Sequence, residues 1–148
     1  MTRQVVLDTE TTGLNAKLGD RIIEIGCIEI LSRSIGERIF HCYLNPERDV
    51  DLGATRVHGM TLDDLRQKPR FGERAKEFLD FVTGAEVIIH NADFDVEFLD
   101  LELKRALFAR LAEVYNSFGY SKDAIAEIAG ACKLDPKDFS LELRADDH

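Results

Sequence analysis

The segment 22–30, Ile-Ile-Glu-Ile-Gly-Cys-Ile-Glu-Ile, constrains the fold of this 148-residue chain more than any other part of it. It is rich in β-branched residues, and its second half alternates apolar and charged positions, which predicts a strand with one buried face. The apolar run 5–7 predicts a strand before it. A further strand is predicted at 39–44, beyond a turn at 34–36. Strands this close in sequence are typical of a hairpin or meander.

A helix and a fourth strand follow these three strands. The helix is predicted to open at Thr61, an N-cap-like residue followed by acids, and to end near Gly84, with apolar residues at helical spacing from Phe71 to Val82. The short apolar segment 86–89 then predicts a strand. Because a helix connects it to the first three strands, we expect this strand to run parallel to the first. The order predicts an α/β fold with helices covering a mixed sheet.

From Phe94 onward the pattern indicates helices only, with a break in the first of them near Arg105. The last amphipathic segment ends at the sequence 134–136, Leu-Asp-Pro. This helical hairpin is weakly similar to one tetratricopeptide repeat, and an ordinary amphipathic hairpin is the alternative. We therefore expect a core at 1–105, a helical hairpin at 106–139 that packs on the core or is appended to it, and a polar tail at 140–148.

The charge of the chain restricts how it could bind nucleic acid. There are 28 acidic residues against 19 lysines and arginines, a net charge of −9. Proteins that bind nucleic acid by neutralising phosphates are normally basic. If this chain binds a polyanion, it must do so locally, through bound cations or a small basic patch.

Cysteine usage and hydropathy indicate a cytoplasmic protein. The three cysteines lie far apart without a Cys-x-x-Cys pair, which favours neither a disulfide framework nor a zinc site and fits a reducing compartment. No apolar run approaches the ~20 residues that cross a bilayer. We expect a cytoplasmic location and no membrane association.

Two acidic residues carry the strongest chemical signal. Asp8 ends the first predicted strand, and Glu10 lies in the polar segment 9–13, a predicted loop that ends in Gly13. Asp8 and Glu10 are two positions apart, so in an extended chain their side chains project in the same direction. Like charges this close repel one another, and a cation between them would offset that repulsion. Asp95 follows the other predicted parallel strand, and we expect it at the same edge of the sheet. Such a cluster of carboxylates would select Mg²⁺ or Mn²⁺.

Two strings of residues give these acids a family context. Residues 8–13, Asp-Thr-Glu-Thr-Thr-Gly, strongly resemble the first motif of the DEDD-type 3′–5′ exonuclease family, in the form found in proofreading epsilon subunits of bacterial DNA polymerase III. Residues 90–95, His-Asn-Ala-Asp-Phe-Asp, are similar to its second motif. The segments between them keep the family's order: 21–26, 57–59 and 68–71. The resemblance covers about residues 4–105.

The resemblance implies an RNase H-like fold and two-metal hydrolysis of a phosphodiester at a DNA 3′ end. Carried over residue by residue, Asp8 would bridge two Mg²⁺ or Mn²⁺ ions. Glu10 would hold the ion that activates water, and Asp95 would hold the other, partly through water. Two such ions stabilise the attacking and leaving oxygens of an in-line displacement.

The resemblance also implies a binding site for the terminal nucleotide of a single-stranded DNA 3′ end. Its residues would be Thr9, Thr11, Thr12, Gly13, His58 and Asn91. The threonine segment would contact the nucleotide through backbone groups. For His58 the alternative is an ordinary loop histidine, and we expect His90 and Asn91 to shape their loop rather than react. A DNA polymerase catalytic subunit is the protein partner that the resemblance implies.

The family's third motif, a His-x-x-x-x-Asp or Tyr-x-x-x-Asp sequence, is not found after Arg105, and neither is the family's last strand. Truncation, fusion, a frame shift or divergence would each explain this switch. A missing general base would cost roughly 10²–10⁴-fold in rate. Two alternatives to an active exonuclease therefore stay open. One is an impaired remnant that still binds metal and nucleic acid, and the other is an interaction module that uses the hairpin 106–139.

Overall fold

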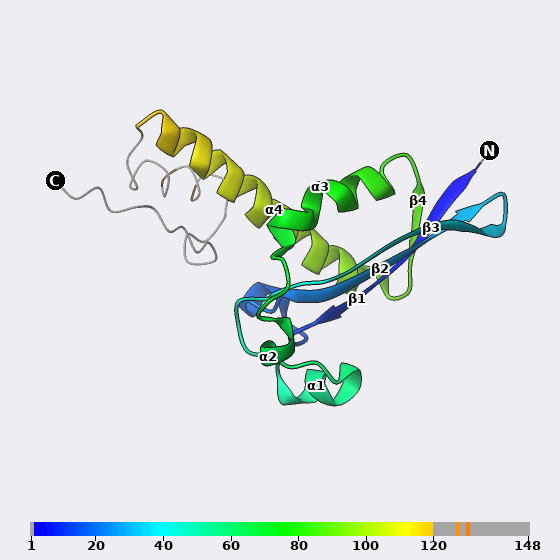
Figure 1. The fold of residues 1–148 in the computed structure, drawn as a ribbon, viewed down its shortest axis with the longest axis horizontal. Helices are drawn as coiled ribbons and strands as arrows, with labels where there is room; N and C mark the ends of the chain where they lie inside the picture. Colours follow the sequence, from blue (N-terminus) through cyan, green and yellow to red (C-terminus); the bar gives the residue numbers. More distant parts are fainter. Residues whose placement is uncertain (1, 120–126, 128–129, 131–148) are drawn as a thin grey trace. The chain divides into compact units, whose positions relative to one another are not determined.

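The computed structural model describes residues 2–119, 127 and 130. It is an α/β structure, as the sequence predicted, with a mixed sheet and helices (Figure 1). The chain divides into two compact units, Met1–Glu102 and Leu103–His148. The first unit contains the whole sheet and all the predicted site residues. The last helix expected from the sequence lies outside the described residues.

The described sheet has four strands in the order β3-β2-β1-β4 (Figure 1). Their bounds are β1 Arg3–Thr11, β2 Ile22–Leu31, β3 Ser34–Tyr43 and β4 Glu86–Ile89. The first three strands form an antiparallel meander, and β4 pairs in parallel with β1. This confirms the meander and the parallel fourth strand that the sequence predicted.

The helices of the described part are η1 Ala16–Leu18, α1 Leu52–His58, α2 Leu62–Leu65, α3 Phe71–Val82 and α4 Ala92–Ser117. The single helix predicted from Thr61 to Gly84 is wrong, because α2 and α3 are separate. Thr61 does stand at the N-cap position of α2, where its backbone N–H and its hydroxyl both donate to Asp64 Oδ2 at 2.8 Å. None of the described helices is long and apolar enough to span a membrane.

Three boundaries differ from the sequence prediction. Strand β1 continues to Thr11, although residues 9–13 look like a loop. The turn between β2 and β3 is at Ser32 and Arg33, with φ values of 49° and 70°, rather than at 34–36. Consecutive left-handed residues suit a two-residue hairpin loop because their twist matches that of the strands. Helix α4 is continuous through Arg105, where a break was expected.

The core lies between one face of the sheet and α3. Phe40 of β3 packs against Phe78 and Phe81 of α3, with ring centroids 6.0 and 6.1 Å apart. Apolar residues of β1 and β2 on the same face are almost fully buried: Val5, Leu7, Ile25 and Cys27. Burying one valine, leucine, isoleucine or phenylalanine side chain stabilises the fold by about 1.5–3 kcal/mol.

We expect Phe40→Ala to lower the free energy of unfolding by about 3–5 kcal/mol, because it leaves a cavity among three packed rings. Chemical denaturation measures this loss. Ile35→Ala is the matched control, since Ile35 is on the same strand and 80% exposed. Equal losses in the two variants would contradict the packing described here.

Candidate active site

Asp8 and Glu10 lie within β1, on the face of the sheet opposite the aromatic core. The strand alternation buries Leu7, Thr9 and Thr11 and turns the two acids to the other side. Asp8 is exposed and Glu10 is half-buried. The sequence placed Glu10 in a loop after the strand, and the ladder of β1 with β2 extends past it instead. The two carboxylates therefore have a rigid support.

The residues across the sheet from these acids form two rows. Asp8 pairs with Gly26 of β2, which pairs with His41 of β3. Glu10 pairs with Glu24, which pairs with Tyr43. Directly paired residues point to the same face, so all of these side chains share one surface, here named the carboxylate face.

Asp95 reaches β1 from the first turn of α4. Its side chain is 4% exposed, and its Oδ1 accepts a hydrogen bond of 2.6 Å from the hydroxyl of Thr9. Thr9 stands between Asp8 and Glu10 in sequence and points away from the carboxylate face. The structure therefore brings Asp95 to the same stretch of β1 as the other two acids, through Thr9.

The pKa of Glu10 responds to its burial and to the charged groups around it. Burial raises the pKa of its carboxyl, and the nearby charges of Asp8, Glu24 and Asp95 raise it further. His58 acts in the opposite direction and lowers that pKa. The ionised form of Glu10 is therefore disfavoured in the folded chain, and a bound cation would favour it.

The donor chemistry of these acids fits Mg²⁺ or Mn²⁺, because both ions prefer carboxylate oxygens. In the part of the chain that the structure describes, no group of three Asp, Glu, His or Cys side chains is arranged to hold one ion. Asp95 Oδ1 is engaged by Thr9, while Asp8 faces solvent. The carboxylates of Asp8, Glu10 and Asp95 thus lie at neighbouring positions, but their oxygens do not surround one common point.

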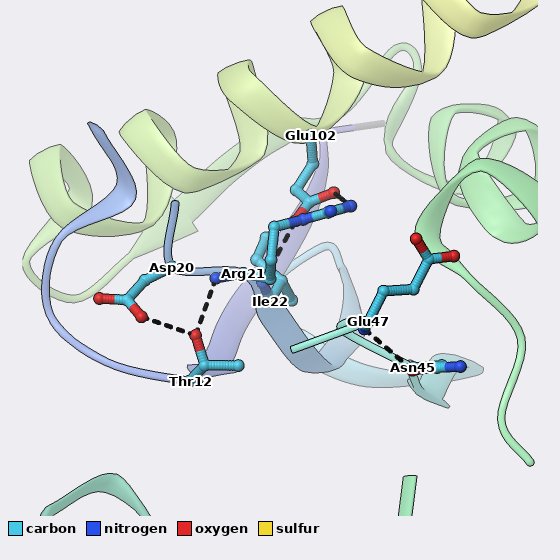
Figure 2. Close-up of polar contacts among 7 residues, drawn as sticks. All are labelled: Thr12, Asp20, Arg21, Ile22, Asn45, Glu47 and Glu102. Atoms are coloured by element: carbon cyan, nitrogen blue, oxygen red, sulfur yellow. Dashed lines mark hydrogen bonds and ion pairs between the residues drawn. The ribbon is translucent and has the colours of Figure 1, made fainter. Parts of the chain in front are cut away.

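The loop after β1 is fixed to the start of β2 at Thr12 (Figure 2). The Thr12 N–H donates to the Arg21 carbonyl at 2.8 Å, and the Arg21 N–H donates to the Thr12 hydroxyl at 3.0 Å. That hydroxyl donates in turn to Asp20 Oδ1 at 2.8 Å. These three bonds hold the backbone that follows Glu10 to the start of β2.

Arg21 also joins this loop to α4 through Glu102 (Figure 2). Its Nε and one terminal nitrogen donate to the two Glu102 carboxylate oxygens at 2.6 and 2.8 Å, a bidentate pair. The Glu102 side chain is 1% exposed and also accepts from the Ile22 N–H at 3.3 Å. Glu102 lies seven residues after Asp95, which is two turns along the same side of the helix. Helix α4 is thus tied at two points, to β1 through Thr9–Asp95 and to the loop before β2 through Arg21–Glu102.

Gly13 lies where a side chain would not fit. A Cβ there would overlap the carboxylates of Asp20 and Asp51, so only glycine is tolerated without moving them. The Thr11 hydroxyl donates to the Gly13 carbonyl at 2.7 Å, and the Asp51 N–H donates to the Thr12 carbonyl at 2.8 Å. The hydroxyls of this segment are used inside the protein.

His58 ends helix α1, and Asn91 directly precedes helix α4. His58 is the last residue of α1; its Nδ1 accepts from the Met60 N–H at 3.1 Å, which leaves Nε2 to donate to the Thr11 carbonyl at 3.3 Å. His58 is thus held against the end of β1. Asn91 has a φ of 54°, and its carbonyl accepts from the Phe94 N–H at 3.1 Å, so it forms the turn into α4.

The sequence analysis missed four residues that shape this site: Arg21, Glu24, His41 and Glu102. Glu24 could have been noticed as the charged residue that interrupts the apolar run of β2. For Glu102 the signal was its position two helical turns after Asp95. His41 Nε2 donates to Glu24 Oε1 at 2.7 Å, a contact between strands that no local pattern indicates.

We expect Glu102→Ala to lower the free energy of unfolding by about 3–5 kcal/mol, because it leaves the Arg21 guanidinium and the Ile22 N–H without this acceptor. Denaturation in urea measures the loss. Glu97→Ala is the control on the same helix, since Glu97 is largely exposed and its ion pair with Lys17 spans 3.6 Å. A loss at Glu102 no larger than at Glu97 would contradict the role given to this pair.

In the absence of divalent ions we expect Asp8→Asn to stabilise the chain at pH 8. The pKa of Glu10 is raised, so repulsion from Asp8 costs stability above that pKa and disappears as Glu10 is protonated at lower pH. Thermal melts in EDTA at pH 8 and pH 4 test this, and Asp80→Asn on α3 is the control. A variant that melts below the parent at pH 8, or that gains equally at both pH values, would refute this electrostatic coupling.

The sequence of this chain is similar to known proteins over most of its length. The RNase T exonuclease family profile matches residues 5–144. The DNA polymerase III subunit epsilon of Rickettsia felis is 47% identical over 118 residues, which cover 78% of this chain and 51% of the relative. The Escherichia coli epsilon subunit is 45% identical over 130 residues, covering 85% and 53%. The chain spans about half the length of these curated relatives.

Solved structures support the fold. Escherichia coli exonuclease I in complex with a dT13 oligonucleotide superimposes with a TM-score of 0.63 at 21% identity, covering 72% of this chain and 24% of the enzyme. The fold is therefore RNase H-like, as the sequence motifs implied. The profile match spans nearly the whole chain, and the first motif lies on β1 while the second leads into α4. This chain belongs to the RNase T exonuclease family, and within that family it resembles the DEDD enzymes of the epsilon type.

Proposed function

We propose that this chain is a 3′–5′ exonuclease that hydrolyses phosphodiesters at DNA 3′ ends with two Mg²⁺ or Mn²⁺ ions. The observation that carries the proposal is the placement of three acids at one stretch of β1, two on the strand and one held against it from α4. Asp8 and Glu10 share the carboxylate face, and Asp95 is held to the intervening Thr9. Family membership supplies the reaction class, and the relatives named epsilon supply the proofreading or repair context.

The proposal gives each acid a role. Asp8 would be the shared ligand of both ions, Glu10 would hold the ion near the attacking water, and Asp95 would hold the other. When bound, the two ions would stabilise the attacking and leaving oxygens. Thr9 would position Asp95 through the 2.6 Å hydrogen bond, and rigid ligand support of this kind is what a metal site needs.

The nucleotide site would lie beside the end of β1. Thr9, Thr11, Thr12 and Gly13 would contact the terminal nucleotide through backbone groups, which is supported by the engagement of the three hydroxyls within the protein. His58 would border this nucleotide from the end of α1, and Asn91 would shape the opposite loop. The ions, rather than lysine or arginine, would meet the phosphate in this acidic chain.

The partners follow from the relatives. Exonuclease I was solved with an oligonucleotide, which supports single-stranded DNA as the substrate of this chain. The epsilon relatives are subunits of DNA polymerase III, which supports a polymerase catalytic subunit as the protein partner. A cytoplasmic location would suit both.

A second candidate is a remnant that binds metal and nucleic acid but turns over slowly or not at all. It is favoured by the absence of a recognisable third motif and, among the described residues, of a ready group of three metal ligands. In that case the predicted hairpin 106–139, most of which lies outside the described residues, would serve protein interaction.

We expect the parent to shorten a 5′-labelled single-stranded DNA from its 3′ end with Mn²⁺ or Mg²⁺. Asp8→Ala would lower the rate at least about 10²-fold, the scale for losing a positioned catalytic group. Gel analysis of timed samples measures both, with Asp80→Ala on α3 as the control.

Undiminished cleavage by Asp8→Ala would contradict the proposal. If the parent does not cleave, titration calorimetry with Mn²⁺ decides between the candidates. Binding that is lost in Asp8→Ala would favour the remnant, and no binding by the parent would exclude both.

A further inference from the structure

Two aromatic side chains share the carboxylate face with Asp8 and Glu10. His41 stands in the row of Asp8, and Tyr43 stands in the row of Glu10, each two strands away. Neighbouring strands lie about 4.8 Å apart, so each ring begins about 10 Å from the acid in its row. A single strand of nucleic acid that ends at the acids could therefore contact both rings.

These rings offer accessible surface rather than core packing. His41 is 45% exposed at its side chain, and Tyr43 is 38% exposed. The two rings meet edge to face with centroids 5.0 Å apart, which holds them as a unit. Exposed aromatic side chains on a sheet are surfaces on which the bases of single strands stack.

A lysine completes the group. Lys68 Nζ lies over the Tyr43 ring, 5.6 Å from its centroid, within the range of a cation–π contact. In the described part of the chain it forms no ion pair with a carboxylate, whereas neighbouring arginines are all paired: Arg66 with Asp63, Arg70 with Glu47, and Arg74 with Glu77. In a chain with a net charge of −9, Lys68 is thus a cation available to a phosphate.

The surface is open at Gly26, which lies between Asp8 and His41. A Cβ added there would meet no heavy atom within 4 Å. Glu24 lies between Glu10 and Tyr43, and its carboxylate accepts a 2.7 Å hydrogen bond from His41 Nε2, which offsets part of its charge. The row from Asp8 to His41 therefore has room for a bound strand at its centre.

We propose that His41, Tyr43 and Lys68 form a contact site for the single strand of nucleic acid that leads to the 3′ end. The rings would stack against bases upstream of the terminal nucleotide, and Lys68 would contact a phosphate. This inference rests on the proposed function, because it takes the acids as the position of the 3′ end. The contact site would add binding groups that take no part in the reaction to a site otherwise composed of acids.

Binding without cleavage tests the proposal. Fluorescence anisotropy of a fluorescein-labelled dT oligonucleotide is measured with Ca²⁺ replacing Mg²⁺, and a gel verifies that the oligonucleotide stays intact. We expect Tyr43→Leu to weaken binding about thirtyfold, the middle of the range for one stacked base, while Tyr43→Phe keeps the ring and binds like the parent. We expect Lys68→Gln to lower the slope of log K against log salt by about 0.7. Lys76→Gln on α3 removes the same charge elsewhere and should leave the slope unchanged.

Each outcome bears on one of the two claims. Parent-like binding by Tyr43→Leu together with an unchanged slope for Lys68→Gln would overturn the contact site, even where the parent cleaves DNA. No binding by the parent would count against the proposed function and this inference alike. If circular dichroism shows that Tyr43→Leu is unfolded, the slope of Lys68→Gln decides, because this substitution breaks no ion pair in the described part of the chain.

Discussion

Two links hold α4, and with it Asp95, against the part of the chain that carries Asp8 and Glu10. At the first link the Thr9 hydroxyl holds Asp95, and two helical turns later Glu102 receives both arms of Arg21. Arg21 is itself bonded to Thr12, immediately beyond the strand that carries Asp8 and Glu10. The bonds therefore close a ring from strand to loop to helix and back to the strand. A shift of α4 along β1 would have to break a buried bidentate ion pair.

Four acidic side chains of the first unit gather around the end of β1. The carboxylate face carries Asp8, Glu10 and Glu24, with Asp95 behind the strand, and the charges of Asp8, Glu24 and Asp95 each raise the pKa of Glu10. The arginines that neighbour Lys68 in sequence are paired with acids, which reduces their attraction for phosphates: Arg66, Arg70 and Arg74. The field favours divalent cations over nucleic acid. Affinity for a polyanion would depend on ions bound first, with Lys68 as a local addition.

The sequence predicted the parts of this site that depend on local periodicity. The first two strands, the parallel β4 and the shared direction of Asp8 and Glu10 all follow from strand patterns and strand geometry. The extension of β1 through Thr11 was missed because threonine and glutamate look like loop residues, while pairing with β2 keeps them extended. Helix α1, which carries His58, and the partner of Glu102 depend on contacts between distant segments. No window of sequence contains that information.

The remaining chemical question is which group could accept the proton of an attacking water. His58 already accepts from Met60 through Nδ1 and donates to the Thr11 carbonyl through Nε2, so its neutral ring has no lone pair to spare. His41 donates Nε2 to Glu24, so its neutral ring keeps a lone pair on Nδ1, but this ring stands two strands from Asp8. Burial and neighbouring acids raise the pKa of Glu10, which would make its carboxylate a stronger base in the metal-free chain. A cation held by Glu10 would favour the ionised form and act against that rise, so the raised pKa does not by itself make Glu10 the proton acceptor of a metal-loaded site.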